Sequence, residues 1–196
     1  MKKLLTTTIA AAAFGLCANT MAEGINFDYL DIGYVDTEYD IKVDGLGSAD
    51  MDTDGFALDF SKMIGSNMYF TANYADQSDD MTESRFGLGY VMARDDKAAA
   101  YVRAEYVKTD IFSNEEGYNA GFGYRSKTDG IFEYGIEIDY TDINVLSGVG
   151  FEPYAQFNFD NGMSLRGSYD YSDLDGSGFE MKTKSFQVSL RLNFNK

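Results

Sequence analysis

An alternation of apolar and polar residues recurs along nearly the whole chain and limits the folds that it can adopt. It is clearest at residues 131–140, IFEYGIEIDY, where aromatic and aliphatic side chains take every second position. The positions between them hold Glu133, Gly135, Glu137 and Asp139. A period of two residues is typical of a β-strand with one apolar and one polar face. The alternation predicts an all-β, antiparallel chain.

Ten stretches follow this pattern, and apart from Asp28 at the start of the first, none places a charge on its apolar side. They cover residues 27–35, 56–61, 70–74, 85–92, 100–106, 118–125, 131–140, 151–159, 165–171 and 186–194. Short turns are expected at 64–67, 94–97, 126–130 and 160–162, the last around an Asp-Asn-Gly hairpin signal. Longer polar loops are expected at 36–54, 76–81, 109–116, 141–148 and 172–182. Pro153 has no N–H to donate, so it is expected near a strand start or at a bulge.

The start of the chain predicts a secretory signal peptide. Lys2 and Lys3 precede an apolar run, and small residues stand three before and one before a cleavage site after Ala22. The run is too short and too alanine-rich for a good transmembrane anchor. Cys17 lacks the small preceding residue of a lipoprotein signal. We therefore expect residues 1–22 to be removed and residues 23–196 to form one domain.

Composition excludes several function classes. Cys17 leaves with the signal, and the chain contains no histidine, so neither a Ser-His-Asp triad nor a histidine metal site can form. The 16 basic residues less Lys2 and Lys3 leave 14 against 32 acidic ones, a net charge near −18. Such a charge argues against binding nucleic acid, whose phosphates require a basic surface.

The pattern favours a membrane-spanning barrel. No long apolar stretch follows the signal, and without helices only a closed β-barrel satisfies every backbone group in lipid. Outer-membrane barrels have an even strand count, short turns at one end and longer loops at the other. They also carry aromatic girdles, and aromatic residues recur here at strand ends: Tyr34, Tyr74, Tyr90, Tyr106, Tyr124, Tyr140, Tyr171 and Phe194. We predict a closed up-and-down transmembrane barrel of ten strands, with eight as the fallback count.

A secreted, water-soluble ten-strand barrel would alternate in the same way, with its apolar residues inside. Two features favour the membrane barrel over it. The polar faces combine arginine, acidic residues and glycine, as a crowded polar lumen would. The lysines that a solvent-facing surface would carry lie mostly in the predicted loops and turns.

Three motifs carry a resemblance to a known group of proteins. They are RFGLGY at 85–90, YNAGFGY at 118–124 and LRLNF at 190–194. Together with the signal and the alternation, they resemble the small, porin-like outer-membrane β-barrel proteins of Gram-negative bacteria. The resemblance covers the whole mature chain. It implies residence in the outer membrane, contact with its lipid and lipopolysaccharide, and insertion by the barrel-assembly machinery.

The resemblance is specific for architecture and not for activity, because the group includes channels, adhesins, structural proteins and enzymes. One departure concerns the insertion signal. Such barrels usually end on an aromatic residue, whereas here Asn195 and Lys196 follow Phe194.

The polar faces predict a set of charged residues inside the barrel. Interleaved signs can pair, which offsets the cost of burying charge. The set serves either as a structural ion-pair network filling a narrow barrel or as the lining of a cation-preferring pore. Its members are Asp31, Asp59, Arg85, Arg103, Glu105, Arg125, Glu133, Glu137, Asp139, Glu152, Arg166, Asp170 and Arg191.

Two acidic motifs resemble the opening of a calcium loop. DMDTDG at 50–55 and DLDGSG at 173–178 place carboxylates two residues apart before a glycine. The twelfth position, which should be a bidentate Glu, is Ser61 in the first motif and Lys184 in the second. The alternatives are weak Ca²⁺ binding and plain solvated acidic loops. The candidate ligands are Asp50, Asp52, Asp54, Asp173 and Asp175; no other cofactor is expected.

These observations predict a non-enzymatic outer-membrane barrel. Its role is envelope structure or narrow passive passage that prefers cations. The alternative is an adhesin or surface-binding module that acts through acidic extracellular loops, with or without divalent cations.

Overall fold

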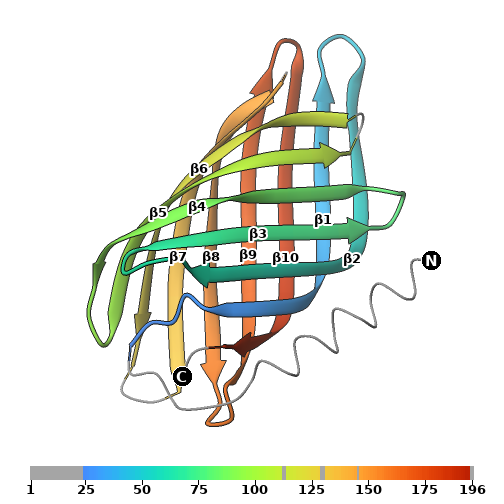
Figure 1. Cartoon of the computed structure of the whole chain (residues 1–196). Helices are drawn as coiled ribbons and strands as arrows, with labels where there is room; N and C mark the ends of the chain where they lie inside the picture. Colours follow the sequence, from blue (N-terminus) through green and yellow to red (C-terminus); the bar gives the residue numbers. More distant parts are fainter. Residues whose placement is uncertain (1–23, 112–113, 129–130, 145, 195–196) are drawn as a thin grey trace, which may run out of the picture.

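The computed structural model describes residues 24–111, 114–128, 131–144 and 146–194, and these form one closed antiparallel barrel of ten strands (Figure 1). The predicted signal peptide lies outside the described residues. Each strand pairs with the next, and the last pairs with the first. The strands are β1 (Tyr29–Val43), β2 (Gly47–Met63), β3 (Met68–Gln77), β4 (Thr82–Arg94), β5 (Ala98–Asp110), β6 (Asn114–Lys127), β7 (Phe132–Ile143), β8 (Leu146–Asn158), β9 (Met163–Gly176) and β10 (Phe179–Asn193). The predicted fold and strand count are confirmed.

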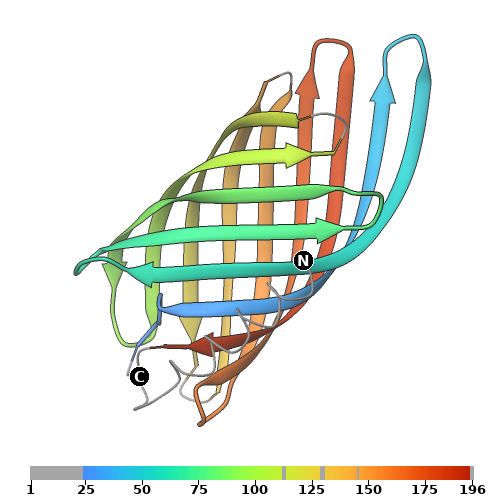
Figure 2. The ribbon, with the colours of Figure 1, turned by 45° about the vertical axis from the view of Figure 1, so that its right-hand side comes forward.

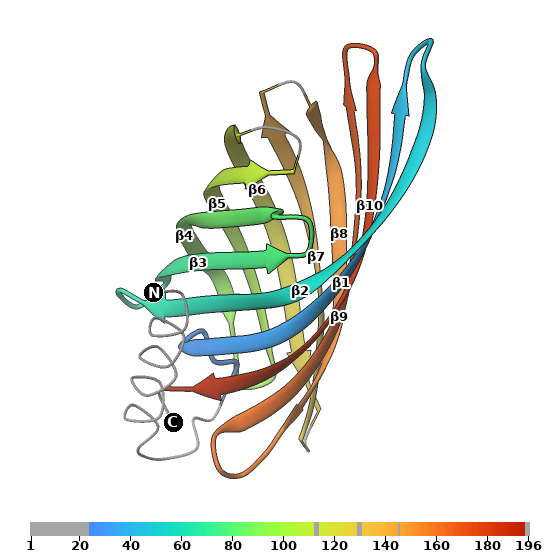
Figure 3. The ribbon, with the colours of Figure 1, turned by 90° about the vertical axis from the view of Figure 1, so that its right-hand side faces the viewer.

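The barrel has two unlike ends. Gly24 and Phe194 lie with the turns at 64–67 and 95–97 at one end, called here the terminal end. The opposite end, called the distal end, holds the connections from β1 to β2 and from β9 to β10. These two hairpins stand out together at the top of Figures 1, 2 and 3. None of the described residues forms a helix long and apolar enough to cross a membrane.

Four of the five predicted long loops are wrong, whereas the loop predicted at 76–81 is close to the observed connection at 78–81. Only residues 44–46, 78–81, 111–113, 144–145 and 177–178 lie between the strands at the distal end. The predicted loop sequences continue the two-residue period with its polarity reversed. In β1, Asp36 and Glu38 point outward, and Thr37 and Tyr39 point into the barrel. These segments were predicted as loops because their outward side chains are charged. Their two-residue alternation is nevertheless that of a strand.

A ring of outward-facing aromatic residues marks where the polarity changes. Ring contacts join its members at 6.1 Å (Phe56 to Tyr74) and 5.1 Å (Phe86 to Tyr106) between centroids. Beyond this ring the outward residues include Asp36, Asp54, Lys108 and Lys184. We call it the distal aromatic ring; it takes one residue from each strand: Tyr34, Phe56, Tyr74, Phe86, Tyr106, Tyr118, Tyr140, Phe151, Tyr171 and Phe186.

Between the distal aromatic ring and the terminal end, the outward surface is apolar. Ile136 and Ile138 are 43% and 54% exposed, whereas Glu137 between them is 5% exposed. The apolar stretch of β7 runs from Phe132 to Tyr140, which is about 27 Å along a strand and roughly 20 Å at the usual barrel tilt. That height approaches the apolar band of about 25 Å found in outer-membrane barrels. An apolar outside around a polar inside rules out the water-soluble alternative.

Pro153 occupies neither of its predicted positions. It lies inside β8 and pairs with Ile136 of β7 on one side. On the other side, the pairing with β9 skips Glu152 and Pro153 and resumes in the same register at Tyr154 and Ser168. The missing N–H therefore costs a local gap in one ladder and does not shift the strand.

Two apolar clusters fill the interior near its two ends. The distal cluster consists of Tyr39, Met81, Val107, Ile143, Leu146, Leu174 and Met181. The terminal cluster consists of Ile25, Phe27, Tyr69, Val91, Ala99 and Tyr101. Phe27 packs 5.0 Å from Tyr69 and 5.5 Å from Tyr101 between ring centroids. The chain ahead of β1 thus enters the barrel and becomes part of its filling.

Candidate functional site

All thirteen predicted lumen residues lie on the inner side of the wall. The two-residue period alone assigns these faces, and it does so correctly at each position. Seven are buried: Asp31, Glu105, Arg125, Glu133, Glu137, Asp139 and Arg191. The other six line the internal cavity: Asp59, Arg85, Arg103, Glu152, Arg166 and Asp170. The buried Arg125, Glu137 and Asp139 line it as well.

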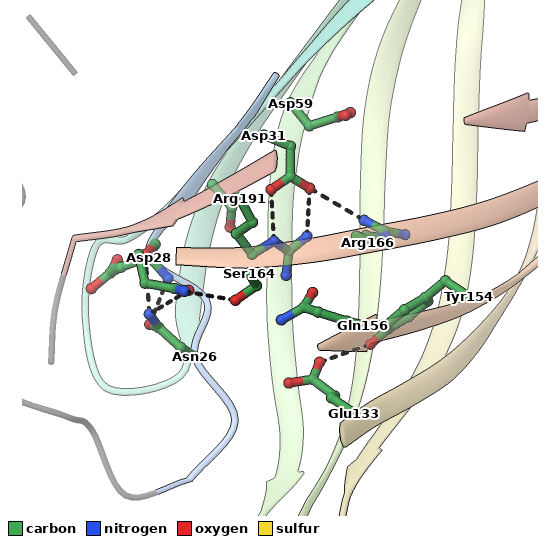
Figure 4. Close-up of polar contacts among 12 residues, drawn as sticks. Asn26, Asp28, Asp31, Asp59, Glu133, Tyr154, Gln156, Ser164, Arg166 and Arg191 are labelled. Carbon is green, nitrogen blue, oxygen red and sulfur yellow. Dashed lines mark hydrogen bonds and ion pairs between the residues drawn. The ribbon is translucent and has the colours of Figure 1, made fainter. Parts of the chain in front are cut away.

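The first ion-pair group lies at the seam where β10 meets β1. Arg191 donates two hydrogen bonds of 2.7 Å to the two carboxylate oxygens of Asp31, a bidentate pair (Figure 4). Arg166 of β9 lies 3.6 Å from the same carboxylate. The guanidinium of Arg191 also sits 3.5 Å from the centre of the Tyr29 ring. Asp31 and Arg191 are 0% and 2% exposed, and their mutual pairing is what makes this burial tolerable.

A second group ties the terminal cluster to the wall. Arg125 of β6 donates to Glu133 of β7 at 2.7 and 2.9 Å. The Tyr154 hydroxyl donates to the same carboxylate at 3.1 Å, as Figure 4 shows. Arg125 also donates to the Asn26 carbonyl at 2.8 Å and stacks 4.9 Å over the Phe27 ring. One arginine therefore holds the entering N-terminal segment inside the barrel.

A third group crosses the middle of the barrel. Arg103 forms an ion pair with Glu137 and lies 3.5 Å from Glu105. The Tyr101 hydroxyl donates to Glu137 at 2.8 Å. Arg166 donates to Glu152 at 2.7 Å, linking this group to the seam.

Three interior carboxylates have no arginine partner among the described residues. Asp59 accepts hydrogen bonds from the side-chain amides of Asn73 and Gln187 at 2.5 and 3.0 Å. Asp139 accepts from Asn119 at 2.7 Å and from Thr141 at 3.3 Å. No hydrogen bond or ion pair joins Asp170 to another residue that the structure describes. The interior is therefore richer in acid than its arginines can neutralise.

A cavity of about 210 Å³ lies within this network. Its lining extends from Phe27 and Tyr69 near one end to Leu174 and Met181 near the other. A polar site needs only about 10–15 Å³ of such volume to hold a water molecule, so this chamber has room for several. Water inside it can satisfy the carboxylates that lack arginine partners.

Sequence reasoning missed part of the interior. Glu83 lines the cavity and receives a 2.7 Å hydrogen bond from Arg85, yet it lies two residues before the predicted strand. Counting back from Arg85 by the same period would have found it. Tyr39 and Tyr69 could have been found in the same way. Counting back from Asp31 by the same period places Phe27 inward, whereas Ile25 lies ahead of the predicted strand and no pattern marks its direction.

The five candidate calcium ligands lie on strands and not in loops. Asp50, Asp52 and Asp54 occupy alternate positions of β2, and Asp173 and Asp175 do so on β9. Carboxylates two apart on a strand are about 6.6–6.8 Å apart and do not wrap an ion as a loop does. Within the described part of the chain, no group of three acidic, histidine or cysteine side chains is placed to hold a metal. Weak divalent-cation binding stays a prediction.

The outward surface beyond the distal aromatic ring pairs its charges unevenly. Lys184 of β10 bridges Glu38 at 3.1 Å and Asp40 at 2.9 Å, both on β1. Lys42 and Lys182 pair at 3.0 and 3.4 Å with acidic residues of β10 and β9. None of the ion pairs among the described residues involves Asp50, Asp52 or Asp54 of β2. The acidic side of this surface is therefore unneutralised along β2.

The fold and its two surfaces define the class of protein: a closed, ten-strand transmembrane β-barrel of the outer-membrane type. Its charged interior and apolar exterior are the reverse of a water-soluble barrel. No protein-family model and no curated protein matches the chain.

Similar solved structures include several outer-membrane barrels. An outer membrane channel from Pseudomonas putida F1 is 9% identical, with a TM-score of 0.49 over 90% of this chain and 100% of that one. The attachment invasion locus protein Ail of Yersinia pestis is 12% identical, with a TM-score of 0.34 over 86% and 100%. The outer membrane protease OmpT from Escherichia coli is 9% identical, with a TM-score of 0.38 over 90% and 99%. These similar structures are a channel, an attachment protein and a protease, so the shared barrel architecture does not indicate one function.

Proposed function

We propose that this protein is a non-enzymatic outer-membrane barrel, closed to passage, that acts through the surface it presents outside the membrane. The observation that carries the proposal is the pair of apolar clusters, one near each end of the polar interior. A conducting pore needs a continuous polar path, whereas apolar constrictions exclude water and ions. The charged network between them then serves to stiffen the wall.

The distal cluster is built from side chains that reach inward from around the barrel. Val107 of β5, Ile143 of β7, Leu174 of β9 and Met181 of β10 are each 6% exposed or less. At the terminal end, Ile25 and Phe27 pack against inward side chains of β3, β4 and β5. Such packing supports a filled barrel.

Outer-membrane residence is supported by the apolar outward surface between the distal aromatic ring and the terminal end, called here the apolar belt. The distal aromatic ring that borders this belt supports it as well. Outward residues of the belt such as Leu88 and Ile136 are exposed and not covered by other parts of the protein. On many strands, the outward residues become charged just beyond the distal aromatic ring. Lipid and lipopolysaccharide are then the neighbours of the wall, and the barrel-assembly machinery is the partner during insertion.

Cell fractionation tests this placement. The protein is expected in the outer-membrane fraction, and its gel mobility is expected to differ between heated and unheated samples. Recovery as a soluble periplasmic protein would contradict the placement.

Planar-bilayer recording tests the closure. The wild-type barrel is expected to give no stable conductance steps. Replacing Leu174 and Met181 with serine, together with Phe27→Ser, is expected to produce steps because it removes bulk from both clusters. Leu46→Ser is the control, since Leu46 is 87% exposed at the β1–β2 turn. Steady wild-type conductance would overturn the proposal.

A narrow cation-preferring channel is the second candidate, and one specific observation favours it. Asp59, Asp139 and Asp170 face a hydratable cavity without arginine partners, so the interior attracts cations. If the protein conducts, reversal potentials in a salt gradient are expected to show cation preference, and Glu137→Lys is expected to reduce it. Preference for anions would contradict this candidate.

A further inference from the structure

The distal part of β2 is an open sheet edge. Its pairing with β1 continues to Gly47 opposite Val43, whereas its pairing with β3 begins only at Gly55 opposite Gln77. On the other flank of the same hairpins, β9 is covered by β8 as far as Gly176 opposite Leu146. Residues 47–53 of β2 therefore have a neighbouring strand on one side only.

The backbone groups on this edge point away from β1. The Asp54 carbonyl accepts a 2.8 Å hydrogen bond from the Ser78 N–H, and the Asp54 N–H donates to the Ser78 hydroxyl at 3.2 Å. The backbone N–H and C=O of Asp54 thus point toward β3. Because these groups alternate in direction along a strand, those of Asp50 and Asp52 point the same way. Ser78 is the last residue to cover the edge. An unpaired row of N–H and C=O groups is a template for an added strand.

The side chains on this edge carry one sign of charge. Asp50, Asp52 and Asp54 are exposed on its outward face and have no ion pair among the described residues. Directly across, β1 adds Asp40 opposite Asp50 and Glu38 opposite Asp52. The lysines of β10 are already engaged with β1 and β9. The adjoining turn contributes Asp79 and Asp80, both exposed.

We propose that the β2 edge binds an extended basic peptide segment, which adds a strand with Lys or Arg opposite Asp50 and Asp52. Residues directly opposite in a sheet share a face, so the basic residues recur at every second position. The intervening side chains lie on the face of Met51, which packs against the distal cluster, and are small or apolar. This inference names the partner class for the surface role proposed above, and it rests on that role.

Charge decides against two other occupants of the edge. A second copy of the chain would set Asp50 and Asp52 against like charges, which destabilises a strand pair. Anionic phosphate groups are repelled for the same reason. A basic strand gains both the backbone hydrogen bonds and the opposite charges.

Peptide titration on the full barrel in detergent micelles tests the proposal. The probe is a nine-residue peptide of alternating lysine and threonine, and its affinity is measured by calorimetry at fixed ionic strength. The double variant Asp50→Asn, Asp52→Asn is expected to bind about fivefold more weakly, as two exposed charge pairs contribute modestly. The matched control, Asp173→Asn with Asp175→Asn, removes the same charge from a strand that is paired on both sides. It is expected to change the affinity by less than about twofold.

Asp52→Pro separates backbone pairing from charge. Proline is tolerated on an edge whose N–H faces solvent, and it removes the donor as well as the carboxylate. It is expected to bind about fivefold more weakly than Asp52→Asn, the effect of one lost hydrogen bond. Unchanged heat-dependent gel mobility checks that the variant folds.

A peptide of the same composition with its lysines in one block distinguishes strand addition from general attraction. It is expected to bind at least about fivefold more weakly than the alternating peptide, since only alternation matches both carboxylates. Equal binding of the two peptides, equal loss in the β9 control, or equal affinity of the Pro and Asn variants would each overturn the proposal. So would wild-type dimerisation through β2 that the Asp52→Pro variant abolishes. A non-conducting barrel that binds no peptide overturns this inference and leaves the proposed closure standing.

Discussion

The distal aromatic ring divides the barrel into two regions: the apolar belt on its terminal side and, on its distal side, the part called here the extension. The same strands form both regions, but their inward and outward faces exchange polarity at the ring. In the belt, β5 points Arg103 inward and Val102 toward lipid; in the extension, β5 points Val107 inward and Lys108 outward. The backbone alternation does not change between the two regions. What changes is the medium outside, and the side chains follow it.

Different interactions hold the two regions together. In the belt, apolar side chains face lipid, so the interior must be held by paired charges whose loss leaves a buried ion. In the extension, the interior holds the apolar distal cluster beside hydrogen-bonded polar side chains such as Thr53 and Gln77. The outward charges there lie in water, where ion pairs contribute little. The same substitution is therefore expected to have different effects on the two sides of the ring.

The largest contrast is expected for arginine and lysine. Arg191→Met leaves Asp31 buried with only the more distant Arg166, and the loss in unfolding free energy is expected to be about 3–5 kcal/mol. Lys184→Met removes two largely exposed ion pairs of the extension, to Glu38 and Asp40, and is expected to cost far less. Denaturant titration in lipid vesicles measures both, and Asp31→Asn with Arg191→Met is expected to recover part of the loss. Equal effects of the two single substitutions would show that buried and exposed ion pairs contribute alike to stability.

Truncation of a buried side chain is expected to affect the interior of the extension more than the interior of the belt. Leu174→Ala removes buried volume from the distal cluster and is expected to cost about 2–5 kcal/mol. Ser189→Ala, at an equally buried inward position of the belt, is expected to be nearly neutral because the Ser189 hydroxyl has no hydrogen-bond partner in the described structure. The same titration compares them, and a neutral Leu174→Ala would show that the extension has no core of its own.

A positive charge on the outward face tests where lipid ends. Ile136→Arg, in the middle of the belt, is expected to cost about 2–4 kcal/mol, and so is Leu88→Arg. Asp36→Arg, one outward position beyond Tyr34 of the ring, is expected to have almost no effect because Asp36 already meets water. Folding measured in vesicles of defined thickness reads this out. A tolerated Ile136→Arg would contradict membrane residence of the belt.

The smallest expected effect concerns pH. A hydrogen bond from Lys184 holds the pKa of Asp40 below its usual 3.8, and Asp40 and Glu38 raise the pKa of Lys184. A carboxyl group whose pKa is lowered by folding stabilises the folded state above pH 3.8. This stabilisation is lost as the pH falls through the pKa of the group in the folded protein. The difference between wild type and Lys184→Met is therefore expected at neutral pH and should vanish in acid. An unfolding midpoint difference that persists at pH 2 would contradict this.

Sequence alone predicted the belt well and the extension poorly. Residues such as Ile136 and Glu137 follow the pattern that defines a lipid-facing strand, so both faces were assigned correctly. Asp50, Asp52 and Asp54 look like a solvated or metal-binding loop when read by composition, although Met51 and Thr53 between them face inward. The reversed polarity could have been recognised only by following the period past the first outward charge.

The ion pairs could not be predicted from sequence. The pattern shows that Asp31 and Arg191 both face inward, but their meeting depends on strand register and on how the barrel closes. Likewise, nothing in the residues around Asn26 or Phe27 indicates that Arg125 will hold this segment within the interior. Side-chain direction is a local property, whereas pairing across the barrel is set by the whole topology.

The seam between β1 and β10 has a consequence for the order of assembly. Asp31 and Arg191 are separated by 160 positions in sequence, so they meet only when the last strand arrives. Closing so long a loop carries an entropic cost that grows only slowly with length, but it delays the contact. Until then, an interior carboxylate of the first strand lacks its bidentate partner, which is costly in hydrocarbon. Insertion one hairpin at a time is therefore disfavoured. We expect β1 to pair with β10 before the strands enter the bilayer or while they do so.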